Sequence, residues 1–420
     1  MKRLLFIVLL LLCQEIIIPQ TLLTLEDCYE KSRMNYPLIK QKDFIEKTKD
    51  YNVSNVWNGY FPQVTINGQA TYQSDVTQVP SFLPGLIIQK LSKDQYKVVA
   101  DVTQTIYDGG IMSSHAGIQE SVYEIDNQKI EIELLNLKER INQIYLGALL
   151  LEAQLAQIEL VKDDLNESIS KLDAAYLNGT ATKSDVDVLR AELLKTEQRI
   201  IELQSSRISY LNMLGLLINE NLNESTILSI PSRIDFLSAD KIIRPELALY
   251  SAQKNLIKNQ DGLTVSKIIP KASLFFQGGY GRPGLNMFIN DFDWFYMTGI
   301  RFSWTLSNFY SHGNESEINQ LNLQGIDALT ETFLLNTKIT ASQQLQEMVK
   351  LNKMIEVDKG IIELRTSVKL AAQSKLENGV ITPGDYIREL NAEDIAKQNL
   401  AIHTIQLLLT QYNYKITTGN

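Results

Sequence analysis

The sequence is poor in the residues that carry catalysis, bind metals or form disulfides. It has two cysteines in 420 residues, too few for a disulfide framework. Its three histidines, His115, His312 and His403, are far apart and lack metal-ligand spacing. No H-E-x-x-H, phosphate-loop or G-x-S-x-G pattern occurs. The sequence therefore predicts no enzyme, no metal site and no cofactor.

Positive charge and long apolar runs are scarce as well. The net charge of -9 and the pI near 5.1 argue against a nucleic-acid partner, which needs a basic face. Beyond the N-terminus no run of about eighteen apolar residues occurs, so no transmembrane helix is expected. The chain is predicted to be acidic and to lack a helical membrane span.

The N-terminus is typical of a signal peptide. Lys2 and Arg3 precede an apolar run over 4–12, which is too short to span a bilayer. We expect residues 1–20 to form the signal peptide, cleaved near 19–21, and the mature chain to be exported. Cys13 follows the run directly and is a candidate lipid-anchor residue, although the bulky Leu12 before it disfavours lipidation.

A glycine-rich stretch, GGYGRPG over 278–284, fits the nucleotide-binding spacing G-x-G-x-x-G. That spacing carries weight only between a strand and a helix. A strand-like run over 271–277 precedes it, but Pro283 lies within the stretch and a second strand-like run follows. We therefore interpret it as a turn between two strands.

The two halves of the chain share one pattern, which predicts an internal duplication with repeats over 21–230 and 231–420. The sequence YLNGTATKSDV begins at Tyr176, and KLENGVITPGDY begins at Lys375. The matched residues of the two stretches are Asn178, Gly179, Thr182 and Asp185, and Asn378, Gly379, Thr382 and Asp385. Extra residues in the first half fall between Tyr72 and Tyr96, where a loop is expected because loops tolerate insertions.

Each half contains two predicted strands, at about 62–74 and 95–107 and at about 270–281 and 293–306. Apolar residues such as Val64 and Ile66 alternate with polar ones such as Asn67, so each strand has one apolar and one polar face.

A soluble sandwich with a half-buried sheet would give the same pattern. Membrane-strand length, export and aromatic residues at the strand ends favour a membrane barrel. The predicted aromatic girdle consists of Tyr72, Tyr96, Tyr280 and Trp294. Four strands cannot close a barrel alone, so it would be shared between chains.

Long helical hairpins are predicted over 110–218 and 310–415. Apolar residues from Ile130 to Tyr176 step by alternating four and three, the period of a left-handed coiled coil, and the helix from Gly110 to Asn178 would be on the order of 100 Å long. The clearest run of the second half is Met354, Val357, Ile361, Leu364, Val368 and Ala371.

The turn of each hairpin shows helix-capping signals. Gly179 and Gly379 fit the left-handed residue that follows a helix. Thr182 and Thr382 fit N-caps, each with an aspartate three residues on, and Pro383 fits the first helical position. Both turns are predicted to be sharp.

A duplicated chain with two strand pairs, two long hairpins and an N-G-x-x-T-x-x-D turn in each resembles the TolC-like outer-membrane efflux protein family. The resemblance covers nearly the whole mature chain. It implies a mostly α fold with a membrane β part: a homotrimer that shares a twelve-stranded β-barrel in the outer membrane of a Gram-negative bacterium and forms an α-barrel in the periplasm. It also implies a periplasmic adaptor (membrane fusion) protein and an inner-membrane transporter as partners, in drug efflux or type I secretion.

The resemblance assigns roles to the hairpin turns. In the family, acidic residues of the second hairpin narrow the tunnel, and Asp385 matches one of these positions. Another acidic position falls on Arg388, with Glu389 beside it, so a salt-bridged latch could replace an acidic ring. Asp185 holds the same place in the first hairpin as Asp385, which leaves open that Asp385 is a helix cap. The expected adaptor-contact residues are Asn178, Gly179, Thr180, Thr182, Asn378, Gly379, Val380 and Thr382.

Two other functions stay open at this point. An exported soluble coiled-coil scaffold with structural or adhesive work would share the export signal and the helices but need no detergent. An enzyme built on a repeat scaffold would require an activity that depends on the histidines.

Overall fold

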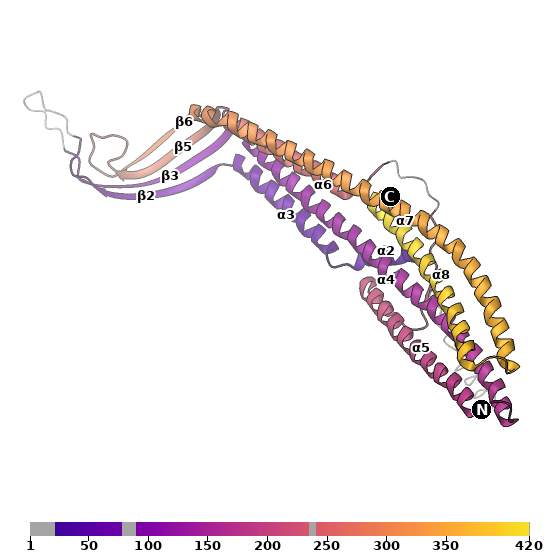
Figure 1. The fold of residues 1–420 in the computed structure, drawn as a ribbon. Coiled ribbons are helices and arrows are strands. Elements are labelled where there is room, and N and C mark those ends of the chain that lie inside the picture. Colours follow the sequence, from indigo (N-terminus) through magenta and orange to yellow (C-terminus); the bar gives the residue numbers. More distant parts are fainter. Residues whose placement is uncertain (1–21, 78–89, 235–240, 420) are drawn as a thin grey trace, which may run out of the picture. The chain divides into compact units, whose positions relative to one another are not determined.

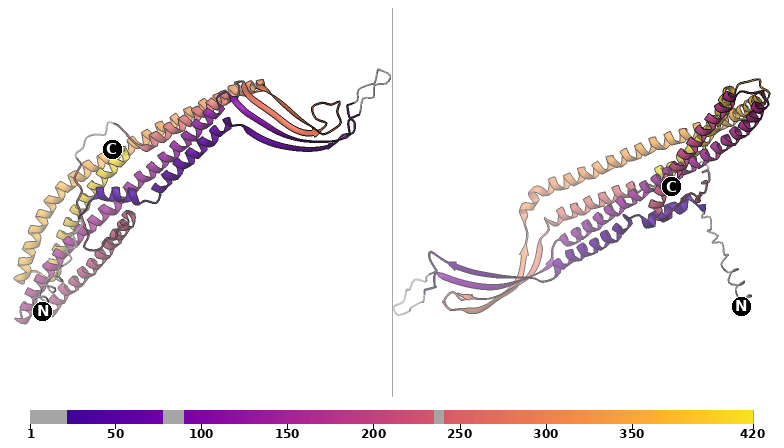
Figure 2. Two further views of the ribbon diagram at one scale, coloured as in Figure 1. Left: turned by 180° about the vertical axis from the view of Figure 1, so that it is seen from behind. Right: turned by 90° about the horizontal axis from the view of Figure 1, so that it is seen from below.

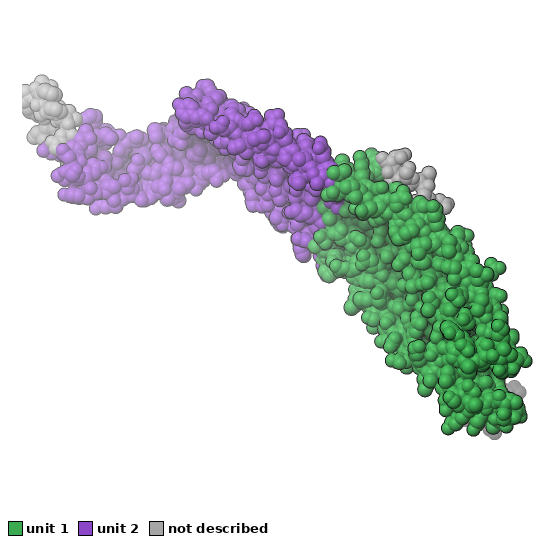
Figure 3. All heavy atoms as spheres, in the orientation of Figure 1, with its two compact units in different colours: residues 1–39, 131–244, 334–420 green, residues 40–130, 245–333 purple. Residues whose placement is uncertain are grey.

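The computed structural model describes residues 22–77, 90–234 and 241–419. The predicted signal peptide and Cys13 lie outside these residues. The chain forms two compact units, coloured in Figure 3. Unit 1 takes residues up to 39, 131–244 and 334–420, and unit 2 takes 40–130 and 245–333. Two long helices contribute to both units.

Unit 2 is built around one four-stranded antiparallel sheet in the order β2-β3-β5-β6 (Figure 1). The strands are β2 (Gln63–Tyr72), β3 (Asp94–Tyr107), β5 (Lys271–Arg282) and β6 (Asp293–Ser303). The helices α3 (Ile39–Trp57) and α6 (Pro245–Ser266), with the short 3-10 helices η1 (Asn58–Tyr60) and η2 (Leu306–Asn308), complete the unit with parts of the long helices.

The predicted strands lie where the alternation places them, with differences at their ends. β5 ends at Arg282, one residue beyond the predicted end, so the first part of the glycine-rich stretch is strand, as predicted. β6 ends at Ser303, three residues before the predicted end, because η2 begins at Leu306 and leads into a helix. The glycine-rich stretch is followed by a strand and not by a helix, which confirms that it is no nucleotide-binding loop of the dinucleotide type.

Unit 1 is helical. Its elements are α2 (Leu25–Asn35), most of α4 (Ile111–Leu177), α5 (Lys183–Ile218), most of α7 (Phe309–Glu377) and α8 (Pro383–Thr418). The hairpins α4–α5 and α7–α8 lie side by side in Figures 1 and 2. Short strands β1 (Leu22–Leu23) and β4 (Ile227–Leu228) pair in parallel, and the hydroxyl of the buried Tyr145 lies 2.7 Å from the carbonyl oxygens of Leu23 and Ser229 beside them.

The heptad pattern of the first hairpin locates its core. With 67 residues, α4 is about 100 Å long. Ile130, Leu134, Ile141, Leu165 and Leu172 from the predicted seam are buried. Among the described helices, only α4 has an 18-residue window apolar enough to cross a membrane. Of that window, 33% is buried within the chain. Ile158, Val161, Leu165 and Leu172 of α4 belong to a core shared with α5, α7 and α8.

The coiled-coil prediction for α7 is wrong in one respect. Val357, Ile361, Leu364 and Val368 are exposed, at 62%, 41%, 70% and 45%. The buried side of α7 instead carries Leu351, Ile355, Ala372 and Leu376 with the polar Asp358 and Lys369 among them. The polar residues interrupt the apolar pattern of the buried side, which is why the exposed stripe gave the stronger signal.

Candidate functional site

The hairpin turns that the sequence singles out have the predicted backbone. Gly179 and Gly379 have φ of 74° and 69°, the left-handed region that glycine enters without steric cost. In the second turn, the amide of Val380 donates to Lys375 at 2.8 Å and the amide of Gly379 to Leu376 at 2.9 Å. These bonds satisfy carbonyls at the end of α7, and the first turn repeats them.

Each turn leads directly into a capping box. The hydroxyl of Thr182 accepts from the amide of Asp185 at 3.3 Å, and Asp185 accepts from the amide of Thr182 at 2.9 Å. Thr382 and Asp385 make the same pair of bonds at 3.2 Å each. The hydroxyl and amide of the threonine lower the pKa of both aspartates, which stay ionised. The capping role of Asp385 is therefore real.

Asp385 has a second partner that Asp185 lacks. Its other carboxylate oxygen accepts from the Arg388 guanidinium, one turn on along α8. Three residues after Asp185 stands Val188, which cannot pair. Glu389 lies 3.9 Å from Arg388 and 3.4 Å from Arg365 of α7. The structure thus brings the predicted gate residues of the second hairpin together as ion pairs.

A groove of about 960 Å³ lies between the two turns. Five of the predicted adaptor-contact residues line it: Thr180, Asn378, Gly379, Val380 and Thr382. Both capping aspartates line it too. Asn178, Gly179 and Thr182 belong to the first turn without lining the groove. Polar capping residues and apolar residues such as Leu376 and Ile381 line the same groove.

Sequence reasoning missed a group of charges inside the bundle. The ammonium group of Lys369 lies 2.8 Å from Asp164 of α4 and 3.5 Å from Glu393 of α8. The side chain of Lys369 is 9% exposed and that of Glu393 is 3% exposed. Burial would lower the pKa of Lys369, but the bond to Asp164 and the charge of Glu393 raise it overall. Burial would raise the pKa of Glu393, but Thr366 and Lys397 hold it low. The sequence signal that could have revealed this group is the presence of charged residues at helix positions that are buried.

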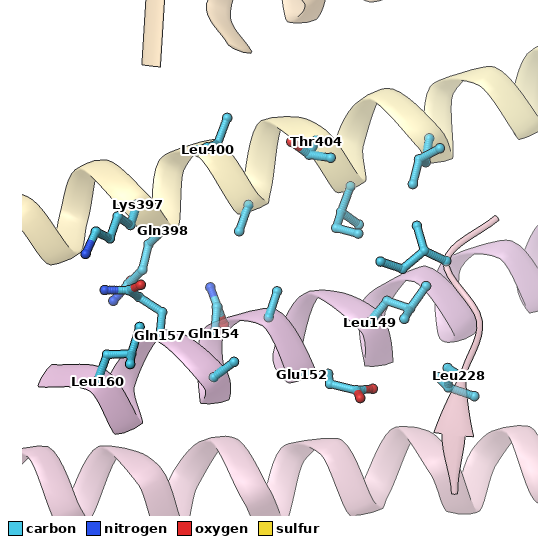
Figure 4. Close-up of a pocket in the computed structure, with 16 residues that line it drawn as sticks. Leu149, Glu152, Gln154, Gln157, Leu160, Leu228, Lys397, Gln398, Leu400 and Thr404 are labelled. Atoms are coloured by element: carbon cyan, nitrogen blue, oxygen red, sulfur yellow. The ribbon is translucent and has the colours of Figure 1, made fainter. Parts of the chain in front are cut away.

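A second groove of unit 1, about 570 Å³, lies between α4 and α8 (Figure 4). Its lining is mostly apolar, with Leu149, Leu160 and Leu400 among the side chains. Glu152 and Lys397 are its charged residues. No sequence pattern pointed to this groove.

The sheet of unit 2 has two chemically different faces. Val64, Ile66, Ile300 and Phe302 on one face are 63% to 73% exposed. The opposite face is polar: Asp101 accepts from Asn67 at 3.0 Å and from Gln277. A soluble sandwich would cover the apolar face with a second sheet, whereas these side chains are uncovered in the chain.

The polar face also carries two phenylalanines, each of which packs against a glycine of the neighbouring strand. A Cβ on Gly279 would lie 2.7 Å from the Phe295 ring, and one on Gly299 would lie 3.0 Å from the Phe275 ring. The Lys97 ammonium lies 4.8 Å from the Phe295 centroid, and the Arg301 guanidinium 4.9 Å from that of Phe275. The glycines let the rings lie along the sheet, where cations cover them.

The predicted aromatic girdle lies at one end of the sheet. Tyr72 ends β2, Tyr96 is near the start of β3, and Tyr280 pairs with Trp294 across β5 and β6. All four side chains are exposed. All four belong to the apolar face.

The histidines do not assemble into a site in the described part of the chain. His403 Nδ1 lies 2.6 Å from Asp358, a contact between α8 and α7. Among the described residues, no group of three or more His, Cys, Asp or Glu side chains is arranged to hold a metal ion.

The chain was compared with protein families, curated sequences and solved structures. Residues 29–220 match the outer membrane efflux protein family. No curated protein sequence matches the chain. The structure is similar to that of the outer membrane protein VceC from Vibrio cholerae, with a TM-score of 0.70 at 14% identity over 94% of this chain and 96% of that one. It is also similar to the CmeC outer membrane channel of Campylobacter jejuni (TM-score 0.68, 12% identity, 94% and 85% covered) and to the open state of the MtrE channel of Neisseria gonorrhoeae (0.68, 12%, 94% and 89%).

The sequence match spans somewhat less than half of the chain, and the structural matches extend the likeness to nearly all of it. At such low identity the structural matches establish the fold. Residues 29–220 thus carry the sequence pattern of the outer membrane efflux proteins and the chain has the fold of their channels, which confirms its resemblance to that family.

Proposed function

We propose that this protein is an outer-membrane exit duct of a Gram-negative bacterium, which extends into the periplasm and passes solutes or secreted protein out of the cell. The observation that carries this proposal is the uncovered apolar face of the four-stranded sheet, with its aromatic residues at one end. Lipid is the environment that such a face fits, and the polar face opposite fits a water-filled lumen. The family match supports the same function.

The working unit is a homotrimer with a shared twelve-stranded barrel. Four strands leave two open edges, which lipid does not tolerate, so other copies must supply the missing strands. The exposed stripe from Val357 to Val368 on α7 supports the same assembly in the helical part. The order helix, two strands and two long helices occurs twice along the chain, which supports an origin by internal duplication.

The gate lies at the hairpin turns. Asp385 and Arg388 there form an ion pair, and deeper in the bundle Lys369 ties α7 to α4 and α8. The chain has no energy-coupling motif, so contact with a periplasmic adaptor, linked to an inner-membrane transporter, would open the gate. The groove between the turns is the adaptor site.

A soluble coiled-coil scaffold is the weaker alternative. It would need to hide the apolar face of the sheet, and that face is exposed along β2 and β6. Detergent dependence of the purified protein separates the two functions.

The test is single-channel conductance in planar bilayers of the wild-type protein and three variants. Asp385→Ala removes a cap and an ion pair, Arg388→Gln removes the ion pairs with Asp385 and Glu389 and keeps the cap, and Asp185→Ala removes a cap alone. We expect discrete small openings in the wild type, larger openings in Asp385→Ala and Arg388→Gln, and wild-type openings in Asp185→Ala.

Each other outcome has a defined meaning. If the three variants conduct like the wild type, the duct stands and the ion pair is no gate. If no protein conducts and all remain soluble without detergent, the duct is wrong and the scaffold is right.

A further inference from the structure

The connection between β5 and β6, residues 283–292, is unusually apolar for a loop. Leu285, Met287, Phe288 and Ile289 are exposed at 57%, 62%, 65% and 44%, and Asp291 is the one charged residue of the connection. Loops that face water are normally polar, and a cluster of exposed large apolar side chains marks a contact surface.

Local hydrogen bonds hold these side chains outward. The side-chain oxygen of Asn286 accepts from the amide of Phe288 at 3.0 Å, and its carbonyl accepts from Ile289 at 3.2 Å. This tight turn places Met287 and Phe288 at its apex. Asn290 and Ser92 exchange bonds of 2.8 and 2.9 Å, which fasten the connection to the segment just before β3. The apolar apex is therefore a built feature.

The connection continues the apolar face of the sheet. The Phe292 ring stacks on Tyr280 with centroids 5.5 Å apart and on Tyr96 at 6.2 Å, and Tyr280 packs against Trp294 at 4.9 Å. These three partners belong to the girdle on the apolar face. The Arg282 guanidinium lies 5.5 Å from the Tyr96 centroid and 5.4 Å from that of Phe292, and it pairs with Asp94, so its charge is balanced within the stack.

We propose that the β5–β6 connection inserts Met287 and Phe288 into the outer leaflet of the membrane and so anchors the barrel beyond the ends of its strands. The inference rests on the proposed function, because it needs the apolar face to contact lipid. Lipid is the occupant because the stack of Phe292, Tyr280 and Trp294 makes the connection continuous with that face. Contact with the same connection of a second copy is the competing occupant.

The test uses an environment-sensitive fluorophore on single introduced cysteines, in vesicles of phosphatidylcholine that hold nitroxide lipids. Cys28 is fully buried and Cys13 belongs to the predicted signal peptide, so the mature folded chain should take no label before a cysteine is introduced. Phe288→Cys reports on the apex, Ser74→Cys is a matched exposed position in the β2–β3 connection, and Ile300→Cys reports on the apolar face of β6. Quenching by iodide measures contact with water.

We expect nitroxide lipids to quench the label at 288 several-fold more than the label at 74, and iodide to do the reverse. Iodide quenching at 288 equal to that at 74 would overturn the insertion. A label at 288 that neither agent reaches would overturn it in favour of contact between copies. If lipids also fail to quench the label at 300, the proposed barrel itself is wrong.

Discussion

A single buried lysine joins three helices of unit 1. Lys369 of α7 contacts Asp164 of α4 and Glu393 of α8, and both it and Glu393 are nearly inaccessible to water. Without Lys369, Glu393 keeps its pair with Lys397 and its bond from Thr366, whereas Asp164 loses its ammonium partner. Leaving the two carboxylates with less compensating charge inside the bundle costs more than the lost attraction. Lys171 offers a contrast, since its pairs with Glu167 and Glu377 lie at the surface, where water replaces them.

We therefore expect Lys369→Met to destabilise the protein by on the order of 3 kcal/mol. Lys171→Met, the same substitution on an exposed lysine, should change the stability little. The measurement is the midpoint of thermal unfolding in detergent, followed by circular dichroism at matched protein concentration. Equal shifts for the two variants would mean that the buried group contributes no more than a surface pair.

At the scale of elements, the hairpin turns could be predicted in full and the helix packing only in part. A turn depends on residues next to one another, so Gly379, Thr382 and Asp385 specify its backbone whatever surrounds it. Which side of a helix is buried depends on residues distant in the sequence. The buried side of α7 is held partly by charges that find partners on α4 and α8, and only the fold brings those partners together.

Two neighbouring glycines of the second turn should respond oppositely to alanine. Gly379 has φ of 69° and open space around a Cβ, so Gly379→Ala meets no clash but strains the backbone by about 1 kcal/mol. Gly384 lies in the first turn of α8, where alanine should stabilise the helix by about 0.5–1 kcal/mol. Hydrogen exchange of the amides from Lys375 to Tyr386 should quicken in the first variant and slow in the second. The same direction in both would refute the assigned backbone roles.

At the scale of the whole molecule, the sequence predicts a chain that is incomplete alone. The strands show a regular alternation and α4 shows regular heptads, because the contacts along these elements repeat. The mostly helical fold with four strands could be inferred from these two patterns. The grooves and the cation-covered phenylalanines could not, because they join residues from different elements, such as Arg301 and Phe275. The apolar run from Val357 to Val368 predicts a coiled-coil contact, but within one chain it faces outward.

The exposed α7 stripe should therefore be needed for assembly and not for the fold of one chain. Leu364 is 70% exposed, so Leu364→Glu should cost a single chain little. In a trimer, Leu364→Glu would place a charge in every interface between copies. There, burial of one apolar side chain contributes about 2 kcal/mol. Ser367→Glu is the matched control, an exposed residue of the same helix off the stripe.

We expect size-exclusion chromatography with light scattering, in detergent, to give trimers for the wild type and Ser367→Glu, and smaller species for Leu364→Glu. Circular dichroism should show the same helix content in all three, because the substituted side chain is outside the core. A trimeric Leu364→Glu would mean that another surface holds the copies together. Loss of helix content in that variant alone would mean that the stripe is part of the fold of the chain itself.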